Sequence, residues 1–181
     1  MDSIMLSKGS TKCITFRIPT EKLNQLHRES ETKQISLNTL INHLFKEHID
    51  WHGRAARAKL YYLPKSFLMR IVNQLTEEQL RELARDTAKN DLVDISLFLR
   101  GGFSIATVSN LAETWLQISK MPYKYEVNTD YCKVVIEHDM GIKYSYLIKE
   151  ISRYLLEVVF EAKTSCDITD NTVVIKFQEK V

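Results

Sequence analysis

Two histidine motifs are the first candidates for chemistry in this sequence of 181 residues. His48 and His52 lie four positions apart, a spacing that in a helix turns both imidazoles toward one ligand. The sequence offers no further ligand that completes a metal-binding set around them. A helix C-terminus favours histidine through the helix dipole. We therefore predict that both histidines end a helix in solvent, and that the chain uses no metal or other cofactor.

The second motif is EHDMG, residues 137–141, which contains His138 and Asp139. An adjacent His-Asp pair is typical of metal-dependent phosphohydrolases, but the other His and Asp ligands of such enzymes are not evident here. Asp139 is instead expected to cap the helix that follows, and His138 to end a strand. We identify no catalytic residue and predict that the protein is not an enzyme.

The three cysteines, Cys13, Cys132 and Cys166, are far apart in sequence and form no CxxC pair. We therefore predict reduced thiols rather than disulfides or a cysteine zinc site. Apolar residues make up 44% and charged residues 27% of the chain, as in a folded soluble protein. No run approaches the roughly 20 apolar residues of a membrane span, and the N-terminus lacks the apolar core of a secretory signal. These features predict a cytoplasmic protein.

Charge is distributed unevenly along the chain, although the net charge is only +2. Residues 1–60 hold 10 Lys and Arg against 6 Asp and Glu, whereas residues 61–181 hold 15 against 17. A basic first third favours a polyanionic partner at that end of the molecule.

The N-terminal elements follow from alternation and periodicity. Residues 1–11 are polar and predict a flexible N-terminus. Residues 12–18 alternate, which predicts a strand that stops at Pro19. Helices are predicted over residues 20–33 and 36–52, the second with Ser36 as N-cap and a strong apolar face. A lone strand has unpaired backbone groups, and about 42 residues cannot bury a core alone. We therefore expect a second copy to pair with the strand.

The rest of the chain predicts a helical segment over residues 54–122 and an α+β region over 123–181, either as two separate parts or as one domain. Helices are predicted from Pro64, from a capping box at Thr76, over residues 91–100, and over 104–120 with Ser104 as cap. Strands at 123–127 and 131–138, a helix at 142–162, and strands at 164–169 and 172–177 give the order β-β-α-β-β. This order predicts an antiparallel sheet with a helix on one face.

Five tyrosines gather around the first predicted hairpin and the long helix. They fit three roles: the lining of a small-molecule pocket, a surface that contacts another protein, or ordinary cross-strand packing. These residues are Tyr123, Tyr125, Tyr131, Tyr144 and Tyr146.

The segment CITFRIP, followed by a polar helix and then by ISLNTLINHLFKEHI, resembles a ribbon-helix-helix DNA-binding domain of the Arc and Met repressor type over residues 12–53. The resemblance implies that strands from two chains form an antiparallel ribbon in the major groove. It implies base contacts from the outward side chains of that strand, which are Cys13, Thr15 and Arg17. Phosphate contacts are expected at the start of the second helix and from two lysines; these residues are Lys12, Lys33, Ser36, Leu37 and Asn38. The expected dimer core comprises Ile14, Phe16, Ile18, Leu40, Ile41, Leu44 and Phe45.

The sequence therefore predicts an α+β protein with a ribbon-helix-helix domain, a helical middle segment and a C-terminal sheet. The predicted function is a homodimeric, sequence-specific transcriptional regulator, archaeal or bacterial as the resembled family is, that binds double-stranded DNA. Its C-terminal region would sense an unknown small molecule, contact a protein or build higher oligomers. The alternative is an interaction protein, antitoxin-like or an assembly factor, whose N-terminal residues serve only for dimerisation.

Overall fold

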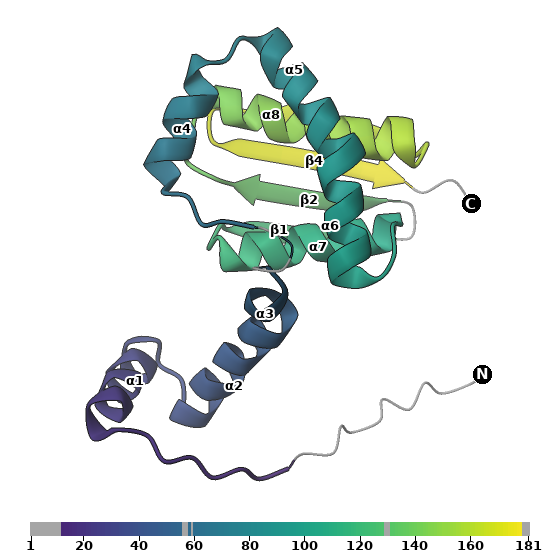
Figure 1. The fold of residues 1–181 in the computed structure, drawn as a ribbon. Helices are drawn as coiled ribbons and strands as arrows, with labels where there is room; N and C mark the ends of the chain where they lie inside the picture. The colour runs from purple at the N-terminus through teal and green to yellow at the C-terminus, as the bar shows by residue number, and fades with distance from the viewer. Residues whose placement is uncertain (1–11, 56–57, 59, 129–130, 179–181) are drawn as a thin grey trace, which may run out of the picture. The chain divides into compact units, whose positions relative to one another are not determined.

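The computed structural model describes residues 12–55, 58, 60–128 and 131–178 (Figure 1). The predicted flexible N-terminus, residues 1–11, lies outside this range. The chain divides into two compact units, Met1–Lys46 and Glu47–Val181. The division falls inside the helix predicted over residues 36–52, which consists of α2 (Leu37–Glu47) followed by a π-helical stretch, η1 (His48–His52).

The N-terminal unit contains α1 (Thr20–Thr32) and all of α2 except its last residue, Glu47. Both helices were predicted from the sequence. Pro19 precedes α1 and accepts a hydrogen bond from the backbone N–H of Leu23, as a residue at a helix start does. The strand predicted over residues 12–18 is absent, since these residues have no regular secondary structure in the single chain. A strand forms only when its N–H and C=O groups pair with a second strand, and the described part of this chain supplies none there.

Helices make up the first half of the C-terminal unit. They are α3 (Gly53–Ala55), α4 (Lys65–Gln74), α5 (Glu77–Asp86), the π-helical η2 (Thr87–Asp91), α6 (Leu92–Arg100) and α7 (Ile105–Ile118). The two predicted caps are confirmed. Thr76 accepts a hydrogen bond from the N–H of Gln79, and Ser104 accepts one from the N–H of Thr107, each as one half of a capping box.

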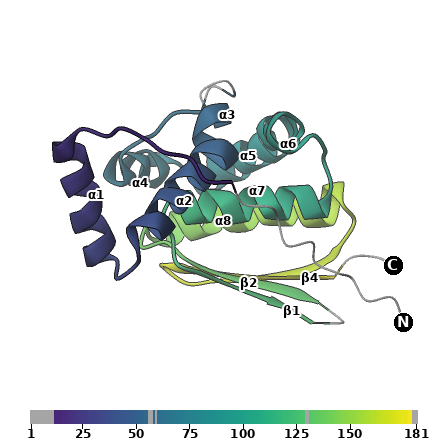
Figure 2. The same ribbon diagram turned by 90° about the horizontal axis from the view of Figure 1, so that it is seen from below.

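The second half of this unit forms the predicted β-β-α-β-β arrangement. Its elements are β1 (Tyr123–Val127), β2 (Cys132–Glu137), α8 (Ile142–Arg153), the π-helical η3 (Tyr154–Val159), β3 (Lys163–Ile168) and β4 (Thr172–Gln178). All neighbouring strands are antiparallel, in the order β1-β2-β4-β3. Helices α7 and α8 lie along one face of the sheet (Figure 2).

Alternation along the strands divides the sheet into an apolar and a polar face. In the register, Val134 of β2 is opposite Ile175 of β4, and Cys132 is opposite Phe177. These side chains pack with Leu116 of α7 and with the helical side of the unit. The opposite face carries charged residues such as Lys133 and Lys176, which are paired with each other in the register. The core of this unit therefore lies between the sheet and the helices α7 and α8.

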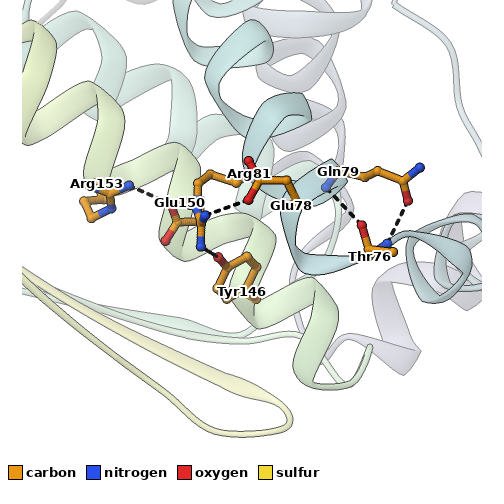
Figure 3. Close-up of polar contacts among 7 residues, drawn as sticks. All are labelled: Thr76, Glu78, Gln79, Arg81, Tyr146, Glu150 and Arg153. Atoms are coloured by element: carbon orange, nitrogen blue, oxygen red, sulfur yellow. Dashed lines mark hydrogen bonds and ion pairs between the residues drawn. The ribbon is translucent and has the colours of Figure 1, made fainter.

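A group of charged residues fastens α5 to α8 (Figure 3). Glu150 of α8 is buried, and its carboxylate accepts a hydrogen bond of 2.7 Å from Arg153 Nη2 and lies 3.8 Å from Arg81 Nε of α5. Arg81 also donates to the hydroxyl of Tyr146 at 2.8 Å and to Glu78 at 2.8 Å. Two guanidinium groups neutralise the Glu150 carboxylate, and its ion pair with Arg81 links α8 to α5.

Among the described residues, no single helix is both long and apolar enough to cross a membrane. One pair, Glu77–Arg100 with Ile105–Ile118, reaches that length and composition only as two pieces that meet at an angle of 89°.

Candidate functional site

Residues 12–18, the predicted ribbon, are exposed along their whole length in the single chain. The predicted base-contacting residues are among them: Cys13, Thr15 and Arg17. The inward row is exposed as well, since Ile14, Phe16 and Ile18 keep 69%, 53% and 37% of their accessible surface. Three large apolar side chains in alternation therefore lack a cover in the described chain.

Helix α2 extends this uncovered apolar surface. The ring of Phe16 contacts the ring of Phe45 on α2, with 5.8 Å between the centroids and a tilt of 55°. Leu44 and Phe45 are themselves exposed. Of the other predicted dimer-core residues on this helix, Ile41 is half-buried, and Leu40 is fully buried within the chain. The contact between the two rings shows that the inward row and the apolar face of α2 belong to one surface.

The start of α2 has the geometry of an anion site on a helix terminus. Ser36 Oγ accepts a hydrogen bond of 3.0 Å from the N–H of Thr39, which confirms its predicted role as N-cap. The N–H groups of Leu37 and Asn38, in the first turn, have no intrahelical acceptor and carry the positive end of the helix dipole. Lys33 is exposed but donates to Glu29 at 2.5 Å. A DNA phosphate that binds Lys33 would replace its ion pair with Glu29. Exposed ion pairs of this kind contribute little to stability, so the cost of replacing it is small.

The turn between α1 and α2 contains a strained residue. Gln34 has a positive φ of 54°, a conformation that favours glycine. Its N–H donates to the carbonyl of Glu31, and the N–H of Ile35 donates to the carbonyl of Ser30. The turn is thus closed by backbone hydrogen bonds at the expense of one unfavourable backbone conformation.

His48 and His52, the pair in the first motif, do not form a common ligand site in the described chain. The Nδ1 atom of His52 is hydrogen-bonded to the hydroxyl of Tyr62, and the two rings are 5.9 Å apart. Within the described ranges, no group of three or more His, Cys, Asp or Glu side chains is placed to hold a metal ion. The three cysteines are free thiols, and burial raises the pKa of Cys166 on β3 to about 11.

In the EHDMG segment, Glu137 ends β2 and residues 138–141 form a tight loop, and the predicted cap at Asp139 is wrong. Helix α8 instead starts after Gly141, whose φ is 84°, without a side-chain cap. Asp139 itself has a positive φ of 51°, and its carboxylate lies 3.4 Å from Lys65 Nζ. The N–H of Gly141 donates to the side chain of Asn171 in the turn between β3 and β4. The loop is therefore held by Gly141 and Asn171.

His138 was predicted to end the strand, but β2 ends one residue earlier, at Glu137, and His138 is buried in the loop that follows. Its Nδ1 accepts a hydrogen bond of 3.1 Å from the N–H of Met140, so its Nε2 carries the proton and donates to Ser145 Oγ at 2.7 Å. The Ser145 hydroxyl in turn donates to the carbonyl of Thr169 at 2.6 Å. Burial, reinforced by Lys65, lowers the pKa of His138, while Asp139 opposes the shift. The lowered pKa favours the neutral form of His138, and Ser145 is fully buried with its proton directed at the Thr169 carbonyl.

The five tyrosines predicted as a group do not stay together, and Tyr131 is exposed and lines neither of the two cavities that Tyr144 lines. Tyr123, Tyr125 and Tyr144 line a cavity of about 750 Å³ between the apolar face of the sheet and the helices. Tyr146 instead belongs to the group of polar residues that links α5 to α8, where it accepts a hydrogen bond from Arg81. Tyr144 also lines a neighbouring cavity of about 570 Å³ beside the EHDMG loop. The sequence indicated these tyrosines, but the cavity depends on packing between distant elements, which local patterns do not describe.

The sequence matches no known protein-family model, and no curated protein matches it.

Proposed function

We propose that this chain is a homodimeric, sequence-specific DNA-binding regulator of transcription, whose residues 12–18 pair with the same residues of a second copy to form a ribbon. The observation that carries the proposal is the uncovered row of Ile14, Phe16 and Ile18, joined to the exposed apolar face of α2 through Phe45. A second copy would cover this row and supply the missing strand.

The polar side of the same residues supports DNA as the partner of the ribbon. Once the inward row is covered, Thr15 and Arg17 lie on the opposite side of the strand, because side chains alternate. Arg17 has the guanidinium that recognises guanine through O6 and N7, and the major groove admits a two-stranded ribbon. The free N–H groups at the start of α2 add a phosphate site of the kind found at helix N-termini.

The C-terminal unit is the effector-sensing or oligomerisation part of this proposal. It has its own core and a sizeable cavity. DNA binding is thus assigned to the N-terminal unit and regulation to the C-terminal one.

The experiment measures binding of the full chain to a selected duplex and to random duplex over a salt series. Contacts to several phosphates should give a steep loss of affinity with salt. Arg17→Ala should weaken binding to the selected site by roughly 1–3 kcal/mol. Arg85→Ala, which removes an exposed arginine of α5 in the other unit, is the matched control and should leave specific binding unchanged. A dimer that shows no salt-dependent DNA binding would favour the alternative, an interaction protein that uses residues 12–18 only to dimerise.

A further inference from the structure

The C-terminal unit holds a cavity of about 750 Å³ that is partly open to solvent. Protein interiors are close-packed, and their few voids are small. Cavities that bind small molecules measure about 300–1,000 Å³. This cavity lies against buried side chains from both layers, including Leu116 of α7, Leu155 of η3 and Phe177 of β4. Its size and position are those of a ligand site.

The chemistry of the walls excludes most charged ligands. The described lining contains no Lys, Arg, His or Asp side chain, and Glu113 supplies its one carboxylate. That carboxylate accepts a hydrogen bond of 2.9 Å from the hydroxyl of Tyr123, which also accepts one from Gln117 at 2.8 Å. A charged ligand would lose its hydration here without gaining a counter-ion. The lining therefore fits an uncharged, largely apolar molecule.

Tyr144 contributes a polar group to the lining. Tyr144 is 4% exposed, its ring packs edge-on against His138, and no described residue hydrogen-bonds its hydroxyl. Burial alone raises the pKa of Tyr144 to about 12, so the phenol is protonated at neutral pH. The hydroxyl is therefore a donor for a ligand with a hydroxyl or carbonyl oxygen.

The backbone around the cavity gives a second, independent indication. The described residues contain three π-helical stretches, and each contributes to the wall: Trp51 from η1, Thr87 from η2, and Leu155 with Leu156 from η3. π-helical turns are rare and occur frequently at functional sites. Three helices are thus widened where they border one cavity.

We propose that this cavity binds an uncharged, mostly apolar small molecule with one oxygen-containing polar group, which hydrogen-bonds to the hydroxyl of Tyr144. The occupant is a small molecule rather than a protein segment, because Trp51, Leu116 and Tyr144 in the walls are buried within this chain's own unit. That the molecule acts as an effector rests on the proposed function; that it binds does not.

The test uses the full chain with Nile red as an uncharged fluorescent probe and three ten-carbon competitors: decanol, decane and decanoate. Nile red should bind saturably, and decanol should displace it and raise the melting temperature. Decanoate should compete at least about tenfold more weakly than decanol, because its charge lacks a counter-ion in the cavity. Equal competition by decanoate, or no saturable binding of Nile red, overturns the proposal.

Two variants locate the site. Tyr144→Phe should weaken decanol about tenfold while leaving decane unchanged, because only the hydroxyl is removed. Tyr146→Phe is the matched control, since Tyr146 bonds to Arg81 outside the cavity lining, and it should leave both ligands unchanged. Val134→Trp on β2 should abolish Nile red binding by filling the cavity. If it unfolds the chain, the Tyr144→Phe and Tyr146→Phe comparison still decides. Equal effects of the two tyrosine variants would overturn the assignment.

The outcomes separate this site from the proposed function. Saturable probe binding without salt-dependent DNA binding supports the site and removes its role as an effector site. Salt-dependent DNA binding without probe binding supports the regulator and overturns the ligand site. Probe binding that weakens as protein concentration rises would assign the cavity to a second copy of the chain, which also overturns the small-molecule proposal.

Discussion

The two units of this chain treat their apolar residues in opposite ways. In the C-terminal unit, Leu80, Leu116 and Val173 are buried by their own chain. In the N-terminal unit, Phe16 and Phe45 contact each other yet remain about half exposed. One unit has a complete core, whereas the other has half of one. This difference supports the proposal that a second copy covers the first unit, because the apolar side chains of that unit are left exposed where those of the second unit form a large core.

The largest effect is expected for Phe16→Ala, which removes a large ring from the half-exposed core of the N-terminal unit. If a second copy covers this ring, its loss should cost about 3–5 kcal/mol per chain. Sedimentation equilibrium should then show a monomer where the unmodified chain forms a dimer, and DNA binding should be lost with it. Phe67→Ala is the control, because Phe67 on α4 is similarly exposed but belongs to the other unit. A Phe16→Ala protein that dimerises normally would refute the ribbon.

The next largest effect is expected for Leu80→Ala, which attacks the complete core. Leu80 on α5 is fully buried, so its truncation should lower the unfolding free energy of the C-terminal unit by about 2–5 kcal/mol. Urea unfolding should give the same midpoint at low and high protein concentration, since no partner is involved. Leu83→Ala, on the exposed side of the same helix, should cost much less. A midpoint that rises with protein concentration would mean that this unit also needs a partner.

A smaller effect, of at most about 1.4 kcal/mol per pH unit, concerns acid stability. The buried environment lowers the pKa of His138 below its unfolded value of about 6.5. The unfolded chain then binds the proton more readily, so the stabilisation is complete above about pH 6.5 and is lost as pH falls through the folded pKa. Unfolding of the C-terminal unit, measured from pH 5 to 8, should show this loss, and His138→Gln should remove it.

The control for this experiment is His27→Gln, on α1 of the N-terminal unit. It should leave the pH dependence of the C-terminal unit unchanged. Acid destabilisation that persists in His138→Gln would assign the effect to other groups.

Local signals in the sequence predicted most of the C-terminal fold. The capping boxes at Thr76 and Ser104 and both hairpins depend on residues close in sequence, so they could be predicted. The neighbouring positions of β2 and β4 could not, since they depend on how α8 crosses the sheet. The same is true of Arg81 beside Glu150, because the two residues come from different helices. Breaks such as η3 shift the hydrogen bonds inside a helix without any distinctive residue type.

For the candidate sites, sequence reasoning was most effective where chemistry is local. Ser36 caps α2 as predicted, because an N-cap needs only its own first turn. Asp139 does not cap α8, because the residue before the helix is Gly141, which has a positive φ of 84°. The pattern of apolar and polar residues does not predict this backbone conformation. The tyrosines were noticed, but their enclosure of a cavity requires the packed positions of the sheet and three helices. The pairing proposed for residues 12–18 would need a second chain, which the structure of one chain does not contain.

The smallest expected effect concerns one strained turn residue in each unit. Gln34 after α1 and Lys120 after α7 both have positive φ, at 54° and 53°. Replacing either by glycine relieves strain and should stabilise its own unit by about 0.5–1 kcal/mol after the entropy of glycine is counted. Gln34→Gly should raise a melting transition that depends on protein concentration, whereas Lys120→Gly should raise one that does not. Gln34→Ala keeps the Cβ atom and should give no gain. If calorimetry shows a single transition that both glycine variants shift equally, the two units unfold together and the contrast between a half core and a complete one is wrong.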